Sequence, residues 1–163
     1  MSVGVGDEGG FAPHVKSNEE PFELIVEAIS RASLQPGKDM GLACDPASSE
    51  FFENGCYHLR REERHLEPEE MVAYCEKLTM AYPLVLLEDG MDQSDWPGWK
   101  QLNAALGERI ELVGDDVFCT NRKLIARGID ENIANAVLIK LNQIGAVTET
   151  IAAIRLAQFR GRG

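Results

Sequence analysis

The chain has 163 residues, of which 44% are hydrophobic and 26% charged, the balance of a soluble globular protein able to bury a core. Its formal net charge of −11 disfavours a nucleic acid or an anionic membrane surface as partner. No run reaches the roughly 18 apolar residues of a membrane helix, and residues 1–10 do not resemble a secretory signal. We therefore expect a cytoplasmic protein, with no nucleic-acid or membrane partner and with reduced cysteines.

The first half of the chain alternates between helical periods and apolar runs. A capping-box pattern at Ser17–Glu20 precedes apolar residues spaced i, i+3, i+4 and i+7, which predict a helix that ends at Pro36-Gly37. The apolar run 40–44 predicts a buried strand, and Asn54-Gly55 predicts a turn among irregular polar residues. A second amphipathic helix is predicted to begin near Glu67-Pro68.

The second half continues the same alternation. Its strands are unbroken apolar runs, which are typical of a parallel sheet covered by helices, so the predicted fold class is α/β. The pattern alone does not separate an open doubly wound sheet from part of a (β/α) barrel, whose complete form needs about 250 residues. The predicted strands are 84–87, 110–113 and 136–139, and the helices that follow them begin near Asp95, Asn121 and Thr148.

Each predicted strand leads into a charged residue. Because the carboxyl ends of parallel strands meet at one edge, these side chains should converge there. Three clustered carboxylates repel one another and suit a hard cation such as Mg²⁺, and a lysine beside such cations is a candidate general base. Ordinary exposed charges are the alternative, which recurrence in all four units disfavours. The four residues are Asp45, Glu88, Asp115 and Lys140.

Five segments resemble signature segments of enolases and follow that family's order. The glycine-rich loop in Val5–Pro13, which by itself could be a surface turn, is similar to a family signature loop. Cys44–Phe51, Leu87–Asp89 and Val113–Asp116 resemble the segments that bear the family's three magnesium ligands. Leu138–Gly145 resembles the segment that bears the catalytic lysine, and this string is the most specific of the five.

The resemblance implies a partial (β/α) barrel of the enolase type over residues 1–163. It also implies that the family's N-terminal domain and last barrel strands, which carry phosphate-binding groups, are not part of these residues. The expected activity is that of a glycolytic carbon–oxygen lyase, which could form a homo-oligomer. The alternative is a truncated, catalytically silent chain that only binds metal or a partner subunit.

The resemblance also implies a role for each candidate residue. Asp45, Glu88 and Asp115 would bind Mg²⁺. Lys140 would remove the C2 proton of 2-phosphoglycerate, and Glu8 would help to expel the C3 hydroxyl as water. The product of these steps would be phosphoenolpyruvate.

Overall fold

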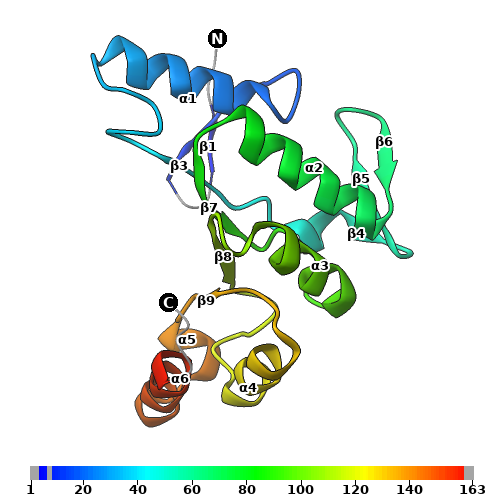
Figure 1. Cartoon of the computed structure of the whole chain (residues 1–163), viewed down its shortest axis with the longest axis vertical. Helices are drawn as coiled ribbons and strands as arrows, with labels where there is room; N and C mark the ends of the chain where they lie inside the picture. The colour runs from blue at the N-terminus through cyan, green and yellow to red at the C-terminus, as the bar shows by residue number, and fades with distance from the viewer. Residues whose placement is uncertain (1–3, 7–8, 160–163) are drawn as a thin grey trace.

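A four-stranded parallel sheet forms the centre of the computed structural model, which describes residues 4–6 and 9–159 (Figure 1). Its strand order is β3-β7-β8-β9, so each strand pairs with the next parallel strand along the chain. This arrangement confirms the α/β class and is consistent with part of a (β/α) barrel. The strands are β3 Leu42–Cys44, β7 Leu84–Glu88, β8 Glu111–Gly114 and β9 Ala136–Val137.

Helices connect the parallel strands, and side chains cap several of their first turns. The carboxylate of Asp95 accepts a hydrogen bond from the backbone N–H of Gly98, which confirms the predicted cap. The side chain of Asn121 accepts one from the backbone N–H of Lys123 and caps the helix predicted to begin near it. Figure 1 shows α1 and α2 toward the β3 end of the sheet and α4 to α6 toward the β9 end. The helices are α1 Glu20–Arg31, α2 Pro68–Ala81, α3 Trp96–Leu106, α4 Arg122–Glu131, α5 Leu141–Ile144 and α6 Val147–Phe159.

The chain also forms antiparallel structure that the apolar runs do not predict. A three-stranded sheet, β4-β5-β6, occupies the segment expected to be irregular. The predicted turn at Asn54 and Gly55 joins β4 to β5, and φ values of 54° and 85° suit this pair of residues. These elements are β1 Gly4–Val5, β2 Phe11–Ala12, the 3-10 helix Ser48–Phe51, β4 Phe52–Glu53, β5 Cys56–Leu59 and β6 Arg64–Leu66.

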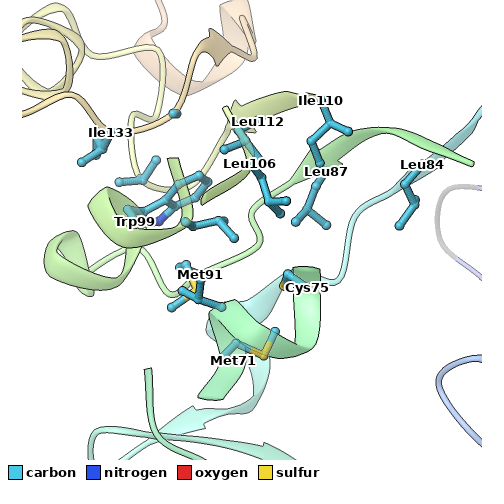
Figure 2. Packing of buried hydrophobic residues seen from close by; sticks show 14 of the residues in the cluster. Met71, Cys75, Leu84, Leu87, Met91, Trp99, Leu106, Ile110, Leu112 and Ile133 are labelled. Carbon is cyan, nitrogen blue, oxygen red and sulfur yellow. The ribbon is translucent and has the colours of Figure 1, made fainter. Parts of the chain in front are cut away.

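The hydrophobic core packs α2 and α3 against the parallel sheet. Figure 2 shows Met71 and Cys75 of α2 below Leu87 of β7, with Trp99 of α3 close to Leu106. Trp99 and Leu106 are fully buried. Each large side chain removed from water in this way stabilises the fold by about 1.5–3 kcal/mol. The core therefore fixes the two helices on the strands whose carboxyl ends carry the candidate site.

Several predicted boundaries differ from the structure. The first helix ends at Arg31, well before the predicted stop at Pro36-Gly37. The first parallel strand begins at Leu42 and not at Met40, whose segment is occupied by a turn that ends in a bridge with Pro36. The last strand is only two residues long, although the Leu138 N–H still donates to the Gly114 carbonyl at 3.0 Å. Among the described residues, no helix is long and apolar enough to span a membrane.

Candidate metal and acid-base site

The parallel sheet places the four predicted charged residues at its carboxyl edge. Asp45 and Asp115 directly follow β3 and β8, and Glu88 is the last residue of β7. Lys140 lies three residues after the end of β9. Because the four strands are parallel and adjacent, their carboxyl ends share one edge. The structure therefore brings these charges to the edge where parallel folds hold their ligands.

Asp115 is a buried carboxylate at this edge. Its side chain is only 8% exposed, and its Oδ2 lies 2.5 Å from the ammonium Nζ of Lys140. Its Oδ1 accepts a hydrogen bond from the amide Nε2 of Gln143 at 2.6 Å. Both oxygens are thus held by donors, and one of these donors carries the opposite charge.

Thr120 and Gln143 support this ion pair, although neither was selected from the sequence. The Thr120 hydroxyl donates to Oε1 of Gln143 at 2.7 Å and accepts from the backbone N–H of Lys140 at 2.9 Å. Thr120 is fully buried and has a positive φ of 52°. One hydroxyl therefore fixes the backbone of the lysine and orients the amide that contacts Asp115. The one local feature that could have drawn attention to either residue is that Gln143 closely follows Lys140 in the sequence.

Asp89 orients the loop that carries Asp115. Its carboxylate is buried, and its two oxygens accept hydrogen bonds from the backbone N–H groups of Asp115 and Asp116, both at 3.0 Å. Burial raises the pKa of Asp89 to about 6, although these N–H donors act in the opposite direction. Sequence reasoning missed Asp89, because its partners lie more than twenty residues away in the chain.

Asp89, Asp115 and Asp116 form the tightest group of oxygen ligands among the described residues. One carboxylate oxygen from each lies within 4.8 Å of the other two. Only Asp115 belongs also to the expected set of metal ligands; Asp45 and Glu88 lie outside this group. Because both oxygens of Asp89 already accept backbone hydrogen bonds, we interpret Asp89 as a support for the loop.

Asp45 and Glu88 contribute charge to the same edge. Burial raises the pKa of the Glu88 carboxyl, and the negative charges of Asp45 and Asp115 raise it further, whereas Lys140 lowers it. Asp45 is exposed, and its Oδ1 accepts a hydrogen bond from the backbone N–H of Ala47 at 2.8 Å. Several mutually repelling carboxylates therefore share one edge. All-oxygen donors of this kind fit a hard cation such as Mg²⁺.

Two other features complete the surroundings of the site. Glu8, the residue expected to act on the leaving hydroxyl, lies outside the described residues, as does Asp7. Among the described glycines of its loop, the Gly9 N–H donates to the Gly6 carbonyl at 2.9 Å. A cavity of about 580 Å³ between α1, α2 and β3 is bordered by Asp45 but by none of the other three predicted charges.

Comparison with known proteins places this geometry in a family. Residues 1–163 match the family model "Enolase, C-terminal TIM barrel domain". The chain is 55% identical over 161 residues to "Enolase 1" of Methanospirillum hungatei, and 58% identical over 156 residues to "Enolase 2" of two pathovars of Pseudomonas syringae. These matches cover 99% and 96% of this chain but only 38% and 36% of the relatives' own length. The chain belongs to the enolase family and corresponds to part of its C-terminal barrel domain.

Proposed function

We propose that this chain carries the metal-binding and proton-abstracting part of an enolase active site, working in the cytoplasm on 2-phosphoglycerate in glycolysis. The observation that supports this proposal best is the ion pair between Lys140 and Asp115 at an edge crowded with carboxylates. In our assignment Asp45, Glu88 and Asp115 bind Mg²⁺. Lys140 is the general base, and the chain's relatives are named as enolases.

The chemistry explains why a base and carboxylates are needed together. A C–H proton beside a carboxylate is very weakly acidic, so its removal requires positive charge already in place. Bound Mg²⁺ would supply this charge to the substrate carboxylate, and such pairing of a lysine base with magnesium is the known pattern of the enolase superfamily. Lys140 would take the C2 proton at Nζ, and Glu8 would give a proton to the departing C3 hydroxyl.

The remaining residues of the site position the reacting groups. Thr120 holds the backbone of Lys140, and Gln143 holds one oxygen of Asp115. Asp89 fixes the backbone of the loop that carries Asp115. Since a base must lie within about 3 Å of the proton that it removes, such supports decide whether the lysine can act.

A catalytically silent chain that binds only metal or a partner subunit is the second candidate. The chain spans just over a third of the length of its curated relatives. β3 and β9 are also the outer strands of the described parallel sheet, so each leaves one edge without a parallel partner there. Unpaired edges favour association or aggregation, and a complete barrel removes them.

Calorimetric titration with Mg²⁺ tests the metal site. We expect Asp115→Asn to weaken binding, because it removes a negative charge and one carboxylate ligand from the site. The control is Asp130→Asn, on the exposed side of α4, which should leave the affinity unchanged. Identical titrations for wild type and Asp115→Asn would contradict the proposed site.

Turnover separates the two candidate functions. For purified residues 1–163 we expect little formation of phosphoenolpyruvate, measured by its absorbance. The phosphate-binding groups that the family uses are expected outside these residues, and positioning of a substrate is worth about 7 to 11 kcal/mol of barrier lowering. Robust turnover that Lys140→Ala abolishes and Lys123→Ala preserves would establish the lyase and exclude the silent alternative.

A further inference from the structure

One exposed face of the β5–β6 hairpin carries four side chains that can bind a transition metal. The strands pair antiparallel with His58 opposite His65. Cys56 and Glu67 lie next to this pair, with the Cys56 thiol 3.3 Å from a Glu67 carboxylate oxygen. Because side chains alternate along a strand, residues two apart share a face. Tyr57, between Cys56 and His58, is accordingly buried on the opposite face.

We call Cys56, His58, His65 and Glu67 the hairpin face. Its two imidazoles lie with their Nδ1 atoms 2.8 Å apart and their ring planes at 76°. Between neutral rings this contact needs one Nδ1 to donate and the other to accept. His65 is exposed and His58 is half-buried, so water and ions can reach the pair.

The spacing of the two nitrogens is close to that of a metal site. Two bonds of about 2.0–2.1 Å from a tetrahedral Zn²⁺ hold their nitrogens about 3.3 Å apart. The two Nδ1 atoms, at 2.8 Å, therefore need to separate by only about half an ångström. Small side-chain rotations supply such a movement at an exposed position. The paired backbone of β5 and β6 would remain in place.

We propose that the hairpin face binds a divalent transition metal, preferentially Zn²⁺, with His58 and His65 as the first two ligands. Cys56 and Glu67 are the remaining ligands and have to turn toward the metal, because among the described residues only Asp89, Asp115 and Asp116 already hold three ligand atoms within 4.8 Å of one another. Binding releases the Cys56 thiol proton to solvent. Imidazole and thiolate donors suit Zn²⁺, whereas Mg²⁺ prefers oxygen donors. The bound metal would link β5 to β6 and stabilise the hairpin.

Calorimetric titration of the whole chain with Zn²⁺, in excess Mg²⁺, tests this proposal. Each of His58→Gln and His65→Gln should weaken Zn²⁺ binding at least about tenfold, since even residues behind metal ligands change affinity by 10–100-fold. His14→Gln is the matched control, because His14 is the third histidine and lies outside the hairpin. Unchanged affinity in both hairpin variants would overturn the proposal.

Two further measurements guard against misfolding and against binding elsewhere. Zn²⁺ should raise the melting temperature of the wild type and of His14→Gln, but not that of His58→Gln, whose metal-free melting temperature should match the wild type. With Co²⁺ as probe, Cys56→Ser should remove the sulfur-to-metal absorbance. Loss of Zn²⁺ binding in Asp115→Asn with retention in His58→Gln would assign the metal to the carboxylate edge and refute the hairpin site.

Discussion

Replacing Gly128 with alanine should destabilise the chain, although alanine is the better helix former. Gly128 lies inside α4, where this substitution normally stabilises by up to about 1 kcal/mol. Here a Cβ would lie 2.4 Å from Cε1 of the buried Phe118 ring. The opposite edge of the ring already packs closely against Gly114, where a built Cβ would lie 2.6 Å from Cδ2 and Cε2, so the ring has little room to retreat. Overpacking costs about 1–3 kcal/mol, so after the gain in helix propensity we expect a net loss of up to about 2 kcal/mol.

Urea denaturation of Gly128→Ala measures this loss directly. Ala126→Gly in the same helix is the control for helix propensity alone, and it should cost up to about 1 kcal/mol. Phe118→Leu removes ring atoms, so adding it to Gly128→Ala should recover part of the loss and give a measurable coupling energy. A variant Gly128→Ala that is more stable than the wild type would refute the reasoning. The result bears on the site, since the Phe118 N–H donates to the Asp115 carbonyl at 3.0 Å.

Other substitutions and a labelling experiment test the polar contacts. Tyr57→Phe should cost about 1–3 kcal/mol in urea denaturation, because the buried Asp92 N–H donates to the Tyr57 hydroxyl at 2.9 Å and would lose its acceptor. Gln143→Glu would place a second carboxylate against Asp115, and at neutral pH should lower stability by about 1–3 kcal/mol. This repulsion raises the pKa of the introduced carboxyl in the folded state. The loss of stability should therefore be absent below pH about 4.3 and grow as pH rises above that value. A stability difference that does not change with pH would contradict the repulsion. Burial raises the pKa of the Cys75 thiol to about 12, so at pH 8 about one thiol in ten thousand is ionised, and rapid alkylation of native Cys75 seen by mass spectrometry would oppose this.

The sequence predicts the parallel sheet and its helices because burial imposes a pattern on them. The face of α2 predicted from Met71, Tyr74, Cys75 and Leu78 is buried throughout. The continuous apolar run 84–87 forms most of β7, a strand inside the sheet. Both segments pack against other elements, so their apolar residues follow the geometry of the helix or strand.

The three-stranded antiparallel sheet β4-β5-β6 was not predicted because half of the side chains of its strands face solvent. In β5 the inward residues are Tyr57 and Leu59, and the outward residues are Cys56 and His58. This alternation has the period of a strand, so a signal was present. It was short and surrounded by charges, which made the segment resemble an irregular loop.

The candidate site shows a similar division between local and distant information. Strand-end positions of Asp45, Glu88 and Asp115 follow from the parallel register, which the apolar runs predict. Asp89 follows β7, and it supports the loop after β8 because the parallel register of β7 and β8 brings their carboxyl ends side by side. No local pattern contains that information, because the donor and acceptor belong to different βα units.

The ion pair at the centre of the site links metal binding to the state of the base. Lys140 occupies Oδ2 of Asp115, the residue shared by the expected metal ligands and the tightest oxygen group. A cation that binds this oxygen must displace the ammonium group, and its charge then disfavours the protonated lysine. Lys140→Ala should therefore strengthen Mg²⁺ binding, whereas Asp115→Asn should weaken it. Opposite shifts in the two titrations would fit a site in which the metal and the lysine compete for one carboxylate, and parallel shifts would mean that the lysine only supports the loop.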